Sequence, residues 1–456
     1  MTVILEAFPI FRQLLGAQAV EPDALYRAIS FTVLQTLDGI PVAYNVLTGE
    51  MLELTADEAA ALSRGEIRGC DAPPALIEKW FLVPTGHDDI GLSCEALELA
   101  RLFQTDTTPV TYTIFTTTDC NARCFYCYEA GAPHVRMTAG TAADTAAFIR
   151  RNYKKGTVQF RWFGGEPLCN PDVIDIICTA MRDAGIPYVS FIVSNAYLFD
   201  DATVEKAKNL WNLLRAQVTL DGTEAIYNKT KAFVYKDGGS AFTVVTDNIE
   251  RLLHADVEVY IRTNVGMHNL DDLLALADWI AARYPDKRHL RVYSHAIFEK
   301  AREAQLPNTA ELRMQKAAAV LRFEAACAAH GMLHPPLMNR ELRTCRCTLD
   351  SPRGLIILPD GRLSKCEHLY DRDFVGDIYH GVTETELTEK FRTRANSREL
   401  CTGCAAFPVC IQLKYCPSEP HYICDAAKRQ IEESALRRRV EATWRAAKKK
   451  AAEAAE

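Results

Sequence analysis

The sequence predicts an α/β fold, a partial (β/α)6 barrel, for the middle of the chain. Six apolar runs rich in β-branched residues recur from about residue 110, and stretches with helical patterning, such as 171–185 and 269–284, separate them. The runs are VTYTIFT, VQFRWF, YVSFIVS, AQVTL, VEVYIRT and LRVYSHAIF. Alternating strands and helices imply a parallel sheet with right-handed crossovers. Six such units are fewer than the eight of a closed barrel, so we expect a partial one.

The residues that follow these runs are polar or glycine-rich each time. They read TTTDC, GGEP, SNA, DG, RTN and SH in chain order. In βα barrels the carboxyl ends of the strands carry the chemistry, because the loops there can vary without disturbing the sheet. We therefore expect a functional site along this rim.

The first hundred residues predict a separate small α+β module. Strand-like runs at 28–37 and 40–52 surround the turn-forming pairs Asp38-Gly39 and Thr48-Gly49. Thr55 and Glu58 have the spacing of a capping box that opens a short helix. An exposed sheet edge can accept a peptide as an extra strand, so peptide recognition is one hypothesis. A simple packing domain is an equally good one.

Composition excludes several functional classes. The chain has 456 residues, of which 48% are hydrophobic and 24% charged, and its formal net charge of −7 gives no reason to expect a nucleic-acid partner. We find neither a secretion signal nor an apolar run of the roughly 18 residues that a membrane span needs. We therefore expect a cytoplasmic protein that does not enter the membrane, whose 16 cysteines serve metal binding or catalysis rather than disulfides.

Three cysteines, Cys120, Cys124 and Cys127, follow the first strand of the barrel. A structural zinc site takes four protein ligands, and a disulfide framework takes an even number of cysteines. Three thiols indicate instead a metal centre with one position left open. Soft ligands of this kind favour zinc, copper or an iron–sulfur cluster.

This Cys-x3-Cys-x2-Cys spacing, with Tyr126 before the last cysteine, resembles the signature of the radical S-adenosylmethionine (SAM) enzymes. The resemblance implies a [4Fe-4S] cluster on the three cysteines, SAM on the open iron, and a 5′-deoxyadenosyl radical that abstracts a hydrogen atom from the substrate. It also implies an electron donor such as flavodoxin or ferredoxin. The chemistry belongs to the cofactor, and the protein positions and shields it.

The resemblance extends along the rim and implies further SAM contacts. Gly164-Gly165-Glu166-Pro167 is similar to the family's GGEP motif, and Ser194-Asn195 matches a position that commonly contacts SAM. Lys231 stands where related enzymes often have an arginine near the SAM carboxylate, which keeps the charge but loses the bidentate fork. The implied cofactor-binding residues are Tyr126, Gly164, Gly165, Glu166, Pro167, Ser194, Asn195, Thr219, Lys231 and Arg262.

Eight further cysteines lie between residues 345 and 424. Taken alone they also fit two CxxC-like zinc sites. Their order resembles the SPASM extension of radical SAM enzymes that act on peptides, with x5 where the family has x3 before Cys416. The resemblance implies two auxiliary [4Fe-4S] clusters. Cys345, Cys347, Cys366 and Cys416 would hold one, and Cys401, Cys404, Cys410 and Cys424 the other.

The expected domains are an N-terminal module at 1–105, the barrel at 106–332, a SPASM domain at 333–430 and a solvated helical tail at 431–456. Two substrate classes compete. Sulfatase-maturating enzymes use an aspartate directly after the Gly-x4-Cys cysteine as a base, and this chain has Glu367 there. Peptide maturases often carry an N-terminal recognition domain of this size, so we favour a maturase that binds a ribosomally made precursor peptide through its leader. The product, a thioether, another cross-link or an epimer, stays open, and a non-catalytic iron–sulfur protein is the third possibility.

Overall fold

The computed structural model describes residues 1–102, 110–234, 239–297, 309–333, 336–339, 347–349, 351–383, 401–410 and 424–454. The chain divides into two compact units. Unit 1 comprises Met1–Asp106, Pro335–Cys347 and Lys390–Glu456, and unit 2 comprises Thr107–His334 and Thr348–Glu389. Across the described ranges, no helix combines the length and the apolar character that a membrane crossing requires.

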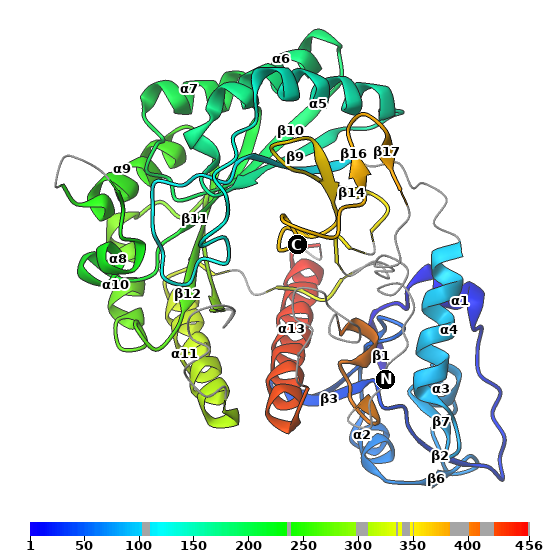
Figure 1. The fold of residues 1–456 in the computed structure, drawn as a ribbon. Coiled ribbons are helices and arrows are strands. Elements are labelled where there is room, and N and C mark those ends of the chain that lie inside the picture. The colour runs from blue at the N-terminus through cyan, green and yellow to red at the C-terminus, as the bar shows by residue number, and fades with distance from the viewer. Residues whose placement is uncertain are drawn as a thin grey trace. The chain divides into compact units, whose positions relative to one another are not determined.

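The centre of unit 2 is a parallel sheet made from the six predicted runs (Figure 1). Each strand pairs in parallel with its neighbours in chain order, which confirms the predicted βα alternation. The strands are β8 (Thr111–Thr117), β9 (Val158–Gly164), β10 (Tyr188–Ser194), β11 (Leu213–Thr219), β12 (Glu258–Val265) and β13 (Leu290–Ala296). Among the described residues β13 pairs with β12 alone, so the sheet stays open on that side, as expected of a partial barrel.

Helices cover the outer face of this sheet (Figure 1). Their apolar stripes enclose the largest core of the molecule, in which α6 buries Val173, Ile177 and Met181 at helical spacing against strand residues such as Trp162. The helices are α5 (Ala139–Asn152), α6 (Pro171–Asp183), α7 (Asp201–Asn209), α8 (Glu224–Lys231), α9 (Ala241–His254), α10 (Leu273–Arg283) and α11 (Ala310–Ala329).

The sheet continues beyond β8 with four strands that the sequence analysis did not assign to it. Strand β14 (Gly354–Ile357) pairs in parallel with β8, and β15 (Arg362–Ser364), β16 (Gly376–Asp377) and β17 (Gly381–Val382) follow in antiparallel order. The backbone groups along the outer side of β8 need partners, and the apolar run Gly-Leu-Ile-Ile supplies them. Part of the segment expected to form the SPASM domain thus extends the barrel sheet.

Unit 1 contains two antiparallel sheets and an apolar core of its own. Asp38 and Gly39, both with positive φ, turn the chain between β3 and β4 in the way such hairpins require, and the capping box at Thr55 and Glu58 is present. One sheet has the order β1 (Thr2–Leu5), β5 (Met51–Glu53), β4 (Ile40–Asn45) and β3 (Thr32–Leu37); the other has β6 (Ile67–Arg68), β2 (Leu25–Ala28) and β7 (Leu82–Pro84). The helices are α1 (Pro9–Leu14), α2 (Ala56–Ser63), α3 (Pro74–Glu78) and α4 (Asp89–Leu102).

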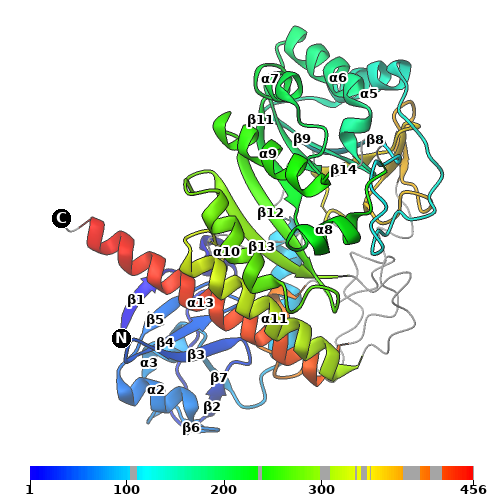
Figure 2. The same ribbon diagram turned by 90° about the vertical axis from the view of Figure 1, so that its left-hand side faces the viewer.

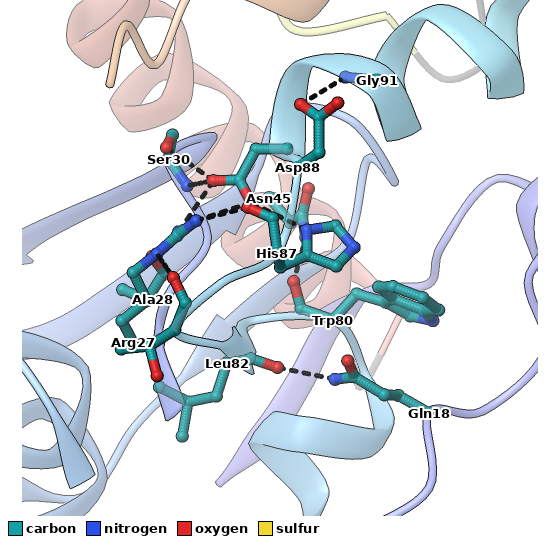
Figure 3. Close-up of polar contacts among 12 residues, drawn as sticks. Gln18, Arg27, Ala28, Ser30, Asn45, Trp80, Leu82, His87, Asp88 and Gly91 are labelled. Atoms are coloured by element: carbon teal, nitrogen blue, oxygen red, sulfur yellow. Dashed lines mark hydrogen bonds and ion pairs between the residues drawn. The ribbon is translucent and has the colours of Figure 1, made fainter. Parts of the chain in front are cut away.

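A buried carboxylate ties α4 to β2 and to the turn between β2 and β3. Asp89, at the start of α4, accepts hydrogen bonds from both Arg27 terminal nitrogens at 2.9 and 3.1 Å and from the Ser30 hydroxyl at 2.6 Å, and it contacts His87. Figure 3 shows Arg27, Ser30 and His87 close together. Burial raises the pKa of Asp89, but these bonds outweigh it and hold that pKa below its ordinary value. The carboxylate therefore contributes stability in its ionised form.

The C-terminal helix α13 (Ala426–Glu453) packs on the four-stranded sheet of unit 1 (Figure 2). Leu436, Val440 and Trp444, spaced four residues apart, form a buried stripe, and the Trp444 indole donates to Glu53 at 2.8 Å. The expectation of a solvated helix was wrong. Many side chains of α13 are charged, which led to the expectation of a solvated helix. Three apolar side chains on one face are nevertheless enough to pack this helix against a small sheet.

Candidate functional site: a cysteine loop on the rim of the barrel

Cys120, Cys124 and Cys127 lie in the loop after β8, and all three are free thiols of intermediate exposure. The backbone N–H of Cys120 donates to the Asp119 carboxylate at 2.9 Å, and that of Cys127 donates to the Cys124 carbonyl at 3.1 Å. Arg123 N–H bonds the Lys231 carbonyl at 2.8 Å, which fastens the loop to the end of α8. The loop is thus held at the carboxyl end of the parallel sheet.

Two glycines at the end of β9 let the chain approach this loop closely. Gly165 N–H donates to the Thr117 carbonyl at 3.0 Å, and Glu166 N–H donates to the Asp119 carbonyl at 2.8 Å. A Cβ on Gly164, which has a φ of +118°, would lie 2.0 Å from the Thr117 carbonyl oxygen, and one on Gly165 would lie 2.4 Å from that of Asp119. The glycine pair is therefore required by the contact between the GGEP segment and the cysteine loop.

Glu166 is fully buried and fixes the next strand end. Its carboxylate accepts from the Ser194 hydroxyl at 2.8 Å, from the Asn195 N–H at 2.7 Å and from the Leu168 N–H at 3.1 Å. Burial raises the pKa of Glu166 to about 7 although these bonds oppose the shift. The Glu166 carboxylate therefore accepts its hydrogen bonds from groups of the protein itself. Pro167 begins the short 3-10 helix η1 (Pro167–Cys169) that follows.

The Asn195 side chain completes this connection by reaching the cysteine loop. Its amide nitrogen lies 2.7 Å from the Asn121 side-chain oxygen and 3.9 Å from the Cys120 sulfur. The segments after the first three strands, predicted from the sequence to share one rim, therefore form one continuous hydrogen-bonded network. It includes Cys120, Gly165, Glu166, Ser194 and Asn195.

A second network holds the other side of the loop. The Tyr126 hydroxyl donates to Asp221 and accepts from the Lys231 ammonium at 2.6 Å and from the Asn264 amide at 3.2 Å. Lys231 also donates to the Thr219 hydroxyl at 2.7 Å. The predicted residues Tyr126, Thr219 and Lys231 are thus brought together around Asp221, at the ends of β11 and β12.

Lys231 forms a buried ion pair with Asp221, at 2.8 Å between the ammonium and the carboxylate. Their side chains are only 2% and 0% exposed. Burial lowers the pKa of Lys231, but Asp221 and Cys124 raise it by a larger amount, so the lysine stays charged. Its charge is largely balanced within the protein.

The thiols fit a metal cluster in their chemistry. Burial raises the pKa of Cys120 to about 12 and that of Cys127 to about 11, and it also raises that of Cys124. Thiolates become favourable there when a metal supplies compensating charge. Among the described residues, no three His, Cys, Asp or Glu side chains converge on one point as the ligands of a single ion do. Thiolates are the usual protein ligands of iron–sulfur clusters, so the three thiols suit such a cluster in their chemistry.

The residues after Cys366 lie against the end of the cysteine loop. The rings of Tyr128 and His368 are 4.4 Å apart between centroids. Burial raises the pKa of Tyr128, and the charges of Glu129 and then Glu367 raise it further. Cys366 itself is buried just after β15. Two segments far apart in sequence, each carrying predicted metal-ligating cysteines, therefore meet within unit 2.

The four cysteines predicted for the other auxiliary cluster are all described, and all belong to unit 1. Arg429 in the first turn of α13 donates to the carbonyls of Thr402 and Gly403. Its hydrogen bond to Glu433 raises the pKa of Arg429, and Cys404 and Cys424 add to this effect. Cys401, Cys404 and Cys424 thus lie around the beginning of α13, with Cys410 closing the same loop. Cys345 and Cys416 fall outside the described residues, and Cys347 and Cys366 belong to different units.

The sequence analysis missed Asp221, Tyr128 and Glu129. Asp221 directly follows β11, so its rim position was a usable signal. Glu129 is 8% exposed, and burial raises its pKa to about 7. No sequence pattern distinguishes it from a surface acid. Arg262, predicted to contact SAM, makes no bond with the networks above, and its Nε atom is buried without a hydrogen-bond partner among the described residues.

The cysteine loop lies in a part of the chain that matches known proteins. Residues 114–280 match the family model of the radical SAM superfamily. The AdoMet-dependent heme synthase of Methanosarcina barkeri is 29% identical over 34% of this chain and 43% of that protein. The GTP 3′,8-cyclase of Chlorobaculum tepidum is 33% identical over 22% of this chain and 31% of that protein. The matches thus span less than half of these curated relatives.

Two solved structures share the fold over more of the chain. Native anSMEcpe with bound AdoMet has a TM-score of 0.55 at 15% identity, covering 74% of this chain and 98% of that one. Streptococcus suis SuiB bound to the precursor peptide SuiA has a TM-score of 0.52 at 12% identity, covering 88% of this chain and 99% of that one. At these identities the likeness concerns the fold alone.

Proposed function

We propose that this protein is a radical SAM maturase that modifies a ribosomally made precursor peptide, most simply by forming a thioether or another side-chain cross-link. The cysteine loop carries the proposal, because it holds three thiols and is hydrogen-bonded to the GGEP segment through its backbone and to Asn195 through the Asn121 side chain. The similarity in fold to SuiB, which was solved with a precursor peptide, covers most of this chain and supports a peptide substrate.

Each part of the rim has a role in this proposal. The three thiolates of the cysteine loop hold a [4Fe-4S] cluster. When bound, that cluster and SAM supply the radical that removes a hydrogen atom from the peptide. Glu166 and Asn195 orient the strand ends around the cofactor, and Tyr126, Thr219 and Lys231 line its other side. Because Asp221 balances the charge of Lys231, this lysine binds the SAM carboxylate more weakly than an unpaired arginine does.

The iron content tests the cofactor assignment. Three cubane clusters predict about twelve irons and about twelve labile sulfides per chain after reconstitution without oxygen. Replacing Cys120, Cys124 and Cys127 together by Ala should remove one third of the iron and abolish SAM cleavage. Stoichiometric zinc without sulfide, or 5′-deoxyadenosine formation by the triple variant, would contradict the assignment. A flavodoxin or ferredoxin in the cytoplasm is the proposed source of electrons.

Glu367 is the proposed base in the second half of the reaction. Closing the peptide product requires loss of one electron and one proton, and Glu367 follows a proposed cluster ligand and lies near Tyr128. Glu367→Gln keeps the shape of the side chain but removes its basicity. 5′-Deoxyadenosine should still form with peptide present, while modified peptide falls by roughly 10²–10⁴-fold. Unchanged peptide modification by this variant, with full iron content, would leave Glu367 a structural residue.

The four-stranded sheet of unit 1 is the proposed site for the leader of the precursor. Its edges in the described part of the chain are β1 and β3, and Arg437 donates to the Leu34 carbonyl of β3 at 2.8 Å. Strand addition at an edge gives affinity through main-chain hydrogen bonds. Leader peptide encoded by a neighbouring small reading frame should slow amide exchange in one of these strands. Unchanged exchange throughout residues 1–102 would contradict strand addition.

A sulfatase-maturating enzyme is the second candidate, because an acid directly follows Cys366. Such an enzyme converts cysteine or serine to formylglycine, an aldehyde that hydroxylamine traps. A cross-linked or epimerised peptide gives no such adduct. A non-catalytic iron–sulfur protein would form no 5′-deoxyadenosine with any substrate, so the same assays separate all three candidates.

A further inference from the structure

Two arginines on the inner face of the barrel sheet stand out because no side chain in the described part of the chain forms a hydrogen bond or ion pair with them. Arg161 lies on β9 and Arg262 on β12. Their chain neighbours Trp162 and Ile261 are buried in the core beneath the outer helices. Because side chains alternate along a strand, both arginines extend from the opposite, inner face. This is the face that the cysteine loop borders at the carboxyl end of the sheet.

The two guanidinium groups have unused hydrogen-bonding capacity. Arg262 Nε is buried and has no hydrogen-bond partner in the described part of the protein. Arg161 is exposed, and no ion pair or hydrogen bond joins its side chain to any described residue. A charged donor removed from water without an acceptor is costly, so the position of Arg262 calls for a ligand.

A third arginine on the same face shows the contrast. The Arg215 Nε and Nη2 atoms bond one Glu258 oxygen at 3.0 and 2.8 Å, and its guanidinium lies 4.2 Å from the Tyr260 ring centroid. Arg215 is thus fully engaged by the protein. The free positive charge of the inner face resides on Arg161 and Arg262.

Tyr293 lies within the electrostatic reach of both arginines. Its hydroxyl reaches from β13 to the Gln217 side chain of β11, at 2.7 Å. Burial raises the pKa of this hydroxyl, and the charges of Arg262 and then Arg161 act in the opposite direction. Strands β9 and β12 are not neighbours, yet the charges of both arginines lower the pKa of this one hydroxyl. Arg262 also faces Thr219 in register, at the end of β11 nearest the cysteine loop.

We propose that Arg161 and Arg262 bind a carboxylate of the substrate, so that the peptide accepted by this protein carries an aspartate or glutamate near its reacting residue. The planar fork of a guanidinium matches a carboxylate with two parallel hydrogen bonds. The inference rests on the proposed function and adds a substrate class to it. A carboxylate also occurs in the methionyl part of SAM, and the test separates the two sources.

The experiment uses the reconstituted full chain with SAM and a pool of short synthetic peptides in which Asp, Glu, Asn and Gln are equally represented. Peptides retained by the protein are identified by mass spectrometry. The wild type should retain acidic peptides about tenfold over their amide counterparts, the ratio expected for one charged hydrogen-bonded contact. Arg161→Gln and Arg262→Gln should each lower that preference toward one. Arg215→Gln, a matched change on the same face, should keep it.

Three results would overturn the inference. The first is a wild-type protein without acid preference, and the second is a preference that persists in both variants. The third is loss of SAM binding by Arg262→Gln in equilibrium dialysis while the acid preference remains, which would assign the carboxylate to SAM. Arg161 is exposed, so its variant gives a result even if Arg262→Gln does not fold. Formation of 5′-deoxyadenosine and peptide modification are scored separately, so the proposed function can fail or stand independently.

Discussion

At the scale of single residues, the site depends on a few groups that tolerate no change of size or charge. The glycine pair 164–165 and the Lys231–Asp221 ion pair are of this kind. Both lie beneath or beside the cysteine loop and fix its position. Changes there should therefore affect metal loading before they affect the barrel as a whole.

Gly165→Ala should displace the cysteine loop, because the added Cβ would lie 2.4 Å from the Asp119 carbonyl oxygen and 2.7 Å from that of Thr118. We expect a large loss of the iron bound at Cys120, Cys124 and Cys127, measured as iron and sulfide per chain. Gly140→Ala is the control, since Gly140 lies in α5 and its Cβ has space. Equal iron content in both variants would show that the close approach is unimportant.

Removing one partner of the buried ion pair should be more harmful than removing both. Asp221→Asn leaves the buried Lys231 charge uncompensated, at a cost of about 3–5 kcal/mol, whereas the double change with Lys231→Met leaves no charge. The midpoint of thermal unfolding should fall furthest in the single variant. If the double variant is as unstable as the sum of the single ones, the two side chains are not coupled.

At the scale of elements, two contacts hold unit 1 together: α13 on the four-stranded sheet, and the Asp89 cluster between α4 and β2. The first contact is mainly apolar and the second is charged. The first should therefore respond to truncation of an apolar side chain, and the second to pH.

Trp444→Ala should destabilise unit 1 by about 3–5 kcal/mol, since it empties a buried aromatic site and leaves the Glu53 carboxylate without the indole donor. Lys449→Ala on the same helix is the matched control, because its side chain is 78% exposed. Chemical denaturation followed by far-UV circular dichroism compares the two. Equal stability would mean that α13 does not pack on the sheet in solution.

The Asp89 cluster predicts a pH dependence. Because the pKa of Asp89 is lowered in the folded chain, its contribution is complete above its ordinary value of 3.8 and is lost as the pH falls through the folded value. Asp89→Asn should lower the unfolding temperature near neutral pH. The difference from the wild type should shrink only in strongly acidic solution. A difference that grows toward acid would have the wrong sign for this cluster.

At the scale of the whole molecule, unit 1 joins three separate parts of the chain in one core. Phe31 of the N-terminal part stacks on Phe407 at 6.0 Å between ring centroids, and α13 covers the same sheet. The cysteines at 401–410 are part of that packing. The N-terminal module is therefore not an independent appendage.

Deleting residues 1–102 should accordingly do more than weaken leader binding. It would expose Phe407, Leu436, Val440 and Trp444 and remove the support of the 401–410 loop. We expect aggregation in size-exclusion chromatography and loss of iron from that loop. A monomeric deletion variant with full iron content would contradict this organisation.

The sequence by itself determined the six alternating βα units, the parallel sheet they form and the rim that carries the cysteine loop. It could do so because strand periodicity, glycine pairs and cysteine spacing are local signals. It also predicted that Gly165, Glu166 and Asn195 lie near Cys120, because the ends of parallel strands share one edge.

Only the tertiary structure decided the rest. Three features depend on strand register and on segments distant in sequence. They are the pairing of Asp221 with Lys231, the contact of His368 with Tyr128, and the position of Arg161 and Arg262 on one face without a side-chain partner among the described residues. The addition of β14 to β8 and of α13 to the N-terminal sheet has the same origin. Strand β14 satisfies backbone groups of β8, and α13 buries apolar surface of the N-terminal sheet. A local sequence pattern shows that a segment needs a partner, but not which distant segment provides it.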